Sequence, residues 1–111
     1  SDVHAVLRDD ASVLDLAAVL HPTAAVAGTP TVEAQKLISE LEPFDRGRYA
    51  GPVGWIGADG DGEWAIALRG ALLSEGQITA YAGCGIVAES EPEAELDETE
   101  LKFKPIREAL A

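Results

Sequence analysis

The chain has 111 residues, enough for one domain with a modest core, and its composition is that of an ordinary soluble globular protein. Twenty acidic residues against eight basic ones give a net charge of -12, which repels nucleic acid and anionic lipid, so neither is an expected partner. A single cysteine excludes an internal disulfide, and no apolar stretch is long enough to span a bilayer. The start shows no export signal, so we expect a cytoplasmic protein.

Two amphipathic helices are predicted in the N-terminal half, over residues 10–20 and 32–41. Asp10 or Ser12 can cap the first helix and Thr31 the second, and a proline follows each. The segment between the helices holds two prolines and a glycine without a sustained period, which predicts an extended, buried connection.

Three consecutive antiparallel strands are predicted in the middle of the chain, over residues 53–57, 63–69 and 77–83. Residues 58–62 have the composition of a hairpin turn, and residues 74–76 give a second turn signal. Helices, a meander and a terminal helix together indicate the α+β class.

Helical periodicity returns from residue 91, although Pro105 is expected to bend or interrupt this helix. A helical wheel separates a buried stripe from charges at its edge. The stripe contains Leu96, Phe103, Ile106 and Leu110, and the edge contains Glu95, Glu98 and Lys102. Two carboxylates three residues apart are suited to a hard cation such as Mg²⁺, and Lys102 could hold an anion beside it. The alternative is an ordinary ion pair between Glu98 and Lys102, with Glu95 solvated.

Arg69 is a second candidate, because strand alternation would place it on one face with two alanines that leave room for a carboxylate. The alternative is a surface arginine near a strand end. Gly83 and Gly85 end the third predicted strand, where backbone N–H groups could cradle an anion. A β-bulge or a tight corner would use these glycines equally well.

Four segments in order, LHPTAAVAGTP, RGRYAGPVGW, WAIALRGA and YAGCGIVAESEPEAELDETELK, resemble the chorismate-utilising enzymes. This family includes the isochorismate, salicylate, anthranilate and aminodeoxychorismate synthases. The resemblance implies that residues 1–111 are the C-terminal part of a chorismate-binding domain whose upstream part is absent. It implies an α/β sandwich of antiparallel strands packed with helices, with chorismate as the ligand and the missing N-terminal part as the partner.

The resemblance also implies roles for individual residues. Those matching substrate-binding positions are Tyr49, Arg69, Gly83, Gly85, Lys102 and Ala25. Glu98 matches a direct Mg²⁺ ligand, and Glu95 matches a ligand or a water-mediated partner of the ion. The lysine general base and the glutamic general acid of the family belong to upstream segments. The chain therefore holds no catalytic residue, and we expect it to be inactive alone.

The His-Pro-Thr form and Ala25 resemble the isochorismate branch, in which water enters at C2 and the C4 hydroxyl leaves. Ala24 departs from the proline usual at its position. Salicylate synthase therefore remains an alternative, and so does a non-catalytic module that only binds chorismate and Mg²⁺. The pathway served would be that of menaquinone or of a siderophore.

Overall fold

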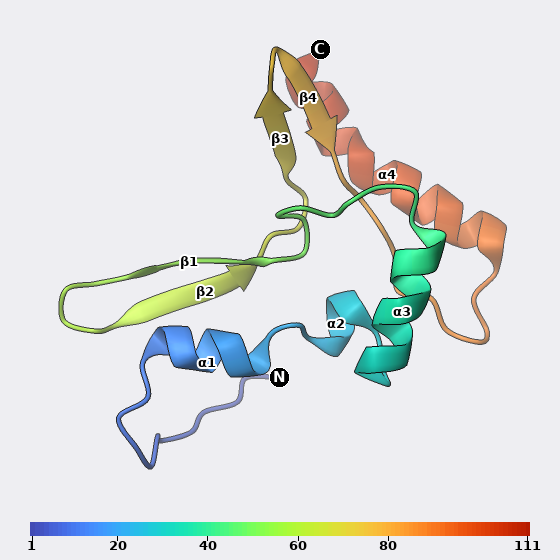
Figure 1. Ribbon diagram of the computed structural model, residues 1–111. Coiled ribbons are helices and arrows are strands. Elements are labelled where there is room, and N and C mark those ends of the chain that lie inside the picture. Colours follow the sequence, from blue (N-terminus) through green and yellow to red (C-terminus); the bar gives the residue numbers. More distant parts are fainter.

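The computed structural model describes residues 1–111 and is α+β, as predicted. Its elements in chain order are α1 (Val13–Leu20), α2 (Ala24–Ala27), α3 (Thr31–Leu41), β1 (Pro52–Ile56), β2 (Gly62–Ile66), β3 (Ala71–Ser74), β4 (Gln77–Ala80) and α4 (Pro92–Leu110). Figure 1 shows the β1–β2 hairpin projecting to one side above α1, while the β3–β4 hairpin and the C-terminal end of α4 point to the top. The loop between α3 and β1 crosses the centre, where these parts meet (Figure 1).

Helix α1 begins at Val13, and Ser12, one of the two predicted caps, is its N-cap. The Ser12 hydroxyl accepts a hydrogen bond from the backbone N–H of Asp15, and the Asp15 carboxylate accepts one from the backbone N–H of Ser12 at 2.8 Å. This reciprocal capping box satisfies two backbone donors. Hydrogen bonds to the Asp15 carboxylate from the Ser12 hydroxyl, at 2.7 Å, and from the Ser12 backbone N–H lower the pKa of Asp15. Residues 10–12, which the predicted helix included, therefore lie outside α1.

The connection between the first two predicted helices is not extended throughout, because α2 forms within it. Alanine favours helix, and Gly28 closes the turn by donating its N–H to the carbonyl of Ala24 at 2.9 Å. The prediction for α3 is wrong in its cap: Pro30 occupies the N-cap position, and Thr31 is the first helical residue. Proline is tolerated there because the first N–H groups of a helix have no intrahelical partner.

Gly28 packs closely on α3 in a backbone conformation that suits only glycine, with φ 75 and ψ 179. A Cβ at this position would lie 2.7 Å from the Cβ of Ala34. Gly28→Ala is therefore expected to lower the free energy of unfolding of the intact protein by about 1–3 kcal/mol, measured by denaturant titration. Gly76→Ala is the matched control, because Gly76 shares the φ of 75 but has open space around it. Equal losses in the two variants would contradict the packing role of Gly28.

The middle of the chain forms two separate two-stranded hairpins and not the predicted three-stranded meander. The second predicted strand ends at Ile66, and Arg69 adopts a left-handed φ of 56 that breaks the extended run. Residues 71–74, which were not predicted as a strand, pair with β4. Glu75 and Gly76 connect these strands with φ values of 50 and 75, as the predicted turn signal requires for a two-residue hairpin.

Helix α4 continues through Pro105 without interruption, contrary to the prediction. Proline removes only one backbone hydrogen bond, and the turns on either side remain bonded. The face of α4 turned toward the rest of the chain is half-buried at Glu95, Thr99, Lys102, Phe103 and Ile106. The predicted stripe is therefore only partly right, because Leu96 and Leu110 are 61% and 57% exposed.

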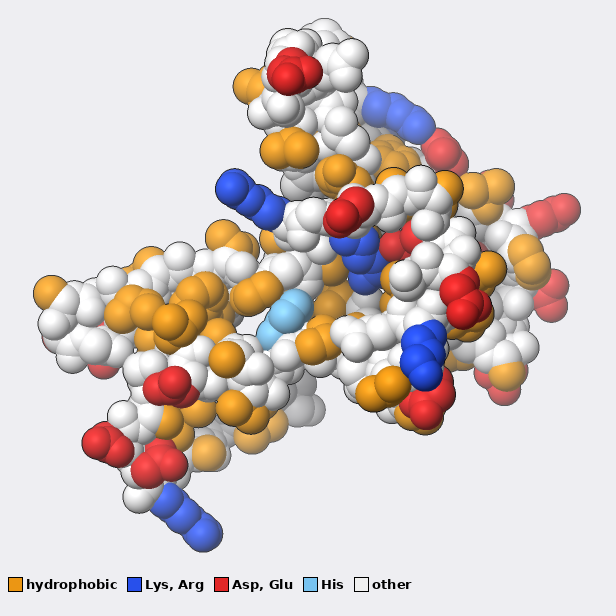
Figure 2. All heavy atoms as spheres, in the orientation of Figure 1, with side chains coloured by type: hydrophobic (Ala, Val, Ile, Leu, Met, Phe, Trp, Pro, Cys, Tyr) orange, Lys and Arg blue, Asp and Glu red, His pale blue; other side chains and the backbone are white.

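Apolar side chains cover much of the surface, and only Ala27 and Ala50 are fully buried. The accessible surface is 9202 Å², whereas a folded monomer of this mass exposes roughly 5,800 Å². The radius of gyration is 16.7 Å, against about 13 Å for a compact domain of this length. Figure 2 shows hydrophobic side chains gathered on the β1–β2 hairpin and beside it. The expected modest core does not form within these residues. No helix has the length and apolar character needed to cross a bilayer.

Candidate functional site

A small pocket of about 90 Å³ lies where the central loop, the segments after β2 and β4, and α4 come together. We call it the Tyr49 pocket; it is lined by Tyr49, Leu68, Arg69, Tyr81, Ala82, Gly83 and Lys102. Four residues predicted to bind substrate thus meet in one place, although 53 positions separate the first from the last. Two cationic side chains and no acidic one line the pocket, in a chain with twenty acidic residues. This local reversal of charge suits a small anion.

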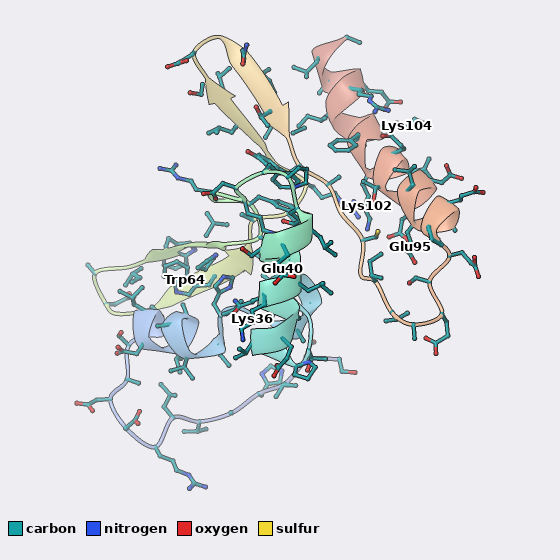
Figure 3. All side chains as sticks on the ribbon, turned by 45° about the vertical axis from the view of Figure 1, so that its right-hand side comes forward. Lys36, Glu40, Trp64, Glu95, Lys102 and Lys104 are labelled. Atoms are coloured by element: carbon teal, nitrogen blue, oxygen red, sulfur yellow. The ribbon has the colours of Figure 1, made fainter.

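Lys102 is fixed at the edge of the pocket by two contacts. Its Nζ donates a hydrogen bond to the carbonyl of Gly83 at 2.8 Å and lies 2.6 Å from Oε1 of Glu98. Figure 3 shows Lys102 and Glu95 on the side of α4 that faces the segment after β4. The simple ion pair considered as the alternative is therefore present, but Lys102 also joins α4 to the wall of the pocket. Glu95 is half-buried and so is not a freely solvated carboxylate.

Arg69 is exposed and makes no ion pair or side-chain hydrogen bond. The predicted reason for its placement is wrong, because β2 ends before Arg69 and strand alternation does not extend to it. The N–H of Leu68 donates to the carbonyl of Ile66 at 2.8 Å, and this tight turn is followed by the left-handed φ of 56 at Arg69. A non-glycine residue held in this conformation is uncommon and is often found at a functional site.

Tyr49 forms the aromatic side of the pocket. Its ring stacks on Tyr81 with centroids 5.3 Å apart and an interplanar angle of 13°, and Phe44 lies 5.7 Å from Tyr81. The Tyr49 hydroxyl reaches the backbone at Gly83, where an added Cβ would lie only 3.1 Å away. Glycine at position 83 therefore lets the phenol approach the chain that follows β4.

Arg46 and Glu42 lie close to Tyr49, and the sequence analysis did not identify either as a candidate site residue. Arg46 binds both carboxylate oxygens of Glu42, at 2.6 Å and 2.8 Å, and lies over the Tyr49 ring with its Cζ 5.7 Å from the centroid. The hydrogen bonds that Arg46 donates to the Glu42 carboxylate raise the pKa of Arg46, so the guanidinium remains charged. The spacing of four residues between glutamate and arginine was the available signal.

Two of the predicted substrate-binding residues do not line the Tyr49 pocket. Ala25 is exposed on α2, and Gly85 is exposed with open space around the position of a Cβ. His21 lines a larger cavity of about 630 Å³ together with Phe44, Arg46 and Tyr49. The roles of Ala25 and Gly85 stay predictions.

Glu95 and Glu98 are the carboxylates that could hold Mg²⁺. They occupy neighbouring turns of α4 and offer the oxygen ligands that this ion prefers. No group of three or more His, Cys, Asp or Glu residues is placed to hold a metal. Since Mg²⁺ takes about six ligands and keeps several waters, the donor set fits one side of a site and does not complete it.

Comparison with known proteins identifies the family of this chain. The sequence profile of the family described as chorismate binding enzyme matches residues 1–111. Isochorismate synthase MenF of Bacillus subtilis (strain 168) is 47% identical over 104 residues, which are 94% of this chain and 22% of that protein. Isochorismate synthase EntC of Escherichia coli (strain K12) is 47% identical over 92 residues, which are 83% of this chain and 24% of that protein.

A crystal structure assigned to the 2,3-dihydroxybenzoate-specific isochorismate synthase DhbC of Bacillus anthracis matches with a TM-score of 0.85 and 50% identity. The match covers 89% of this chain and 26% of that one. The chain therefore spans about a quarter of the length of the relatives it matches. Because the family profile matches every residue from 1 to 111, this chain belongs to the chorismate-binding enzyme family.

Proposed function

We propose that this chain is the C-terminal portion of an isochorismate synthase, which converts chorismate to isochorismate. Water adds at C2 of the ring and the C4 hydroxyl leaves, so substrate and product are isomers. The observation that carries the proposal is the Tyr49 pocket, where the unpaired guanidinium of Arg69 and the ammonium of Lys102, which is paired with Glu98, lie inside a strongly acidic chain. Chorismate is a dianion with two carboxylates, which is the charge that such a pocket would attract. The names of the relatives support the same activity.

The pocket residues would divide the binding of the ligand among them. Arg69 has a free guanidinium and would grip one carboxylate through two parallel hydrogen bonds. Lys102 would supply a second positive charge, and the open backbone at Gly83 would donate its N–H group. Tyr49 would provide a flat apolar wall and a hydroxyl at the same rim. Held in this way, the ring is oriented for attack before the chemistry begins.

Glu98 and Glu95 would hold Mg²⁺ beside Lys102. When bound there, the ion would neutralise and orient the ring carboxylate of the substrate. The contribution of this chain is to place two carboxylates on one helix and a lysine next to them, so that the positive charge of the metal adds to that of Lys102 and Arg69.

The remaining chemistry would come from the rest of the protein. A lysine general base for the entering water and a glutamic general acid for the departing hydroxyl are not supplied by these residues. The surface in excess of a compact monomer is roughly 3,400 Å², and its apolar side chains would pack against the part of the enzyme that carries both groups. The chain alone would therefore bind weakly and turn over no substrate.

The test is to incubate the intact protein with chorismate, with and without Mg²⁺, and to identify the products by liquid chromatography and mass spectrometry. Isochorismate formation that stops on adding EDTA and returns with Mg²⁺ is the expected result. Salicylate and pyruvate would instead assign the protein to the salicylate synthases. Absence of turnover would overturn the proposal of an enzyme.

A further inference from the structure

Arg46 is held by three hydrogen bonds, one from each of its side-chain nitrogens. Its Nε and Nη2 bind the two carboxylate oxygens of Glu42 in a fork at 2.8 Å and 2.6 Å, and Nη1 donates to the carbonyl of Val26 at 2.8 Å. The two charged side chains are each 27% exposed, so the pair is partly shielded from water. These bonds tie the end of α3 to α2 and to the central loop, and each side-chain nitrogen of Arg46 takes part in one of them.

The fixed guanidinium lies over the ring of Tyr49, with its Cζ 5.7 Å from the centroid. The backbone of Tyr49 is fixed as well, since its N–H donates to the carbonyl of Arg46 at 2.8 Å. The next residue, Ala50, is 5% exposed and has a left-handed φ of 62. Its N–H donates to the carbonyl of Ala67 at 2.9 Å. The Tyr49 ring thus has a fixed backbone and is contacted by a guanidinium that does not line the Tyr49 pocket.

We propose that Arg46, locked by Glu42, is a positioning residue that fixes the Tyr49 ring as a wall of the substrate pocket. Arg46 does not line the Tyr49 pocket, and each of its side-chain nitrogens is already bonded within the chain, so we assign it no direct contact with a ligand in that pocket. Arg46 would affect chorismate binding only through the position of the Tyr49 ring. This inference rests on the proposed function, because it assigns Arg46 an effect on chorismate binding.

The first experiment is a double-mutant cycle in the intact protein, read from the KM and kcat for chorismate. Arg46→Lys keeps the charge but loses the fork to Glu42 and the planar contact with the ring. We expect it to raise KM about tenfold, with a smaller change in kcat, and Glu42→Gln to do the same. In a Tyr49→Ala background, Arg46→Lys should add almost nothing to KM. Additive losses in the double variant would overturn the proposal, because a residue that only stabilises the fold does not act through Tyr49.

The second experiment does not depend on turnover. 3-Fluorotyrosine is placed at position 49 alone, and the fluorine resonance of the ligand-free intact protein is recorded. We expect Arg46→Lys to shift or broaden this resonance because the ring loses its fixed neighbour. Arg48→Lys is the matched control, since Arg48 lies two residues after Arg46 and directly before Tyr49, but is exposed and makes no ion pair.

An unchanged resonance in Arg46→Lys, or an equal shift in Arg48→Lys, would overturn the positioning role. If the wild-type protein did not convert chorismate, the proposed function would fail, and the fluorine resonance alone would still show whether Arg46 fixes the ring. The two failures are thereby distinguished.

Discussion

Arg69→Ala in the intact protein is expected to raise the KM for chorismate roughly 100-fold to 20,000-fold, with little change in stability. The guanidinium would lose two charge-assisted hydrogen bonds to a carboxylate, each contributing about 1.5–3 kcal/mol. A tenfold change corresponds to about 1.4 kcal/mol, which gives the stated range. Arg69 is exposed and unpaired, so its removal leaves no buried group without a partner. Steady-state kinetics and a denaturant titration measure the two effects.

Two further variants distinguish a direct contact between Arg69 and chorismate from the effect of the net charge of the protein. Arg69→Lys keeps the charge but cannot form the planar fork, so a loss of roughly tenfold is expected. Arg8→Ala removes one positive charge from an exposed residue near the N-terminus and changes the net charge by the same amount as Arg69→Ala. If Arg69→Ala and Arg8→Ala had the same KM, Arg69 would not be part of the binding site.

The elements that could be predicted from the sequence are those whose signals are local. Ser12 caps α1 through atoms within three residues of it, and the Glu75-Gly76 turn needs only its own two backbone conformations. The terminal helix was also found, since its periodicity and Pro92 at the first turn act within the helix. In each case the decisive interaction lies close in the chain.

The predictions that failed depend on contacts between distant residues. The second strand was predicted to extend to Arg69, but pairing with the chain before β1 ends at Ala67, whose N–H donates to the carbonyl of Gly51 at 2.8 Å, and the chain then turns into a new hairpin. Leu96 and Leu110 were assigned to a buried stripe from their periodicity, yet nothing within these 111 residues covers them. An amphipathic pattern shows that a face is to be buried and does not show what buries it.

The candidate site also combines residues that local signals placed correctly with residues whose positions depend on distant contacts. The wheel placed Lys102 correctly at the edge of the covered face of α4, because helix geometry alone decides this. Arg69 reaches the pocket through a left-handed turn that no strand pattern indicates. The contact of Arg46 with Tyr49 was missed because the loop conformation, and not the spacing, brings the guanidinium over the ring. The resemblance to a family predicted that Tyr49 and Arg69 belong to one site, but it gave no indication of Arg46.

Glu98→Gln is expected to weaken Mg²⁺ binding by the intact protein roughly 100-fold or more and to abolish activity at ordinary Mg²⁺ concentrations. The amide keeps the shape of the side chain but removes the charge that a hard cation requires. Loss of a residue that only supports a metal ligand already costs about 10-fold to 100-fold in affinity, so loss of a ligand should cost at least as much. Calorimetric titration with Mg²⁺ measures the affinity independently of turnover.

Glu100→Gln is the matched control for this substitution, because it removes the same charge from the same helix two residues away. The Glu98 and Glu100 side chains are 53% and 52% exposed, and each forms one ion pair, with Lys102 and Arg107 respectively. Exposed pairs of this kind contribute about 0–1 kcal/mol, so both variants should unfold at nearly the wild-type denaturant concentration. Only Glu98→Gln should lose Mg²⁺ affinity. Equal affinities in the two variants would remove Glu98 from the metal site and leave its contact with Lys102 as an ordinary ion pair.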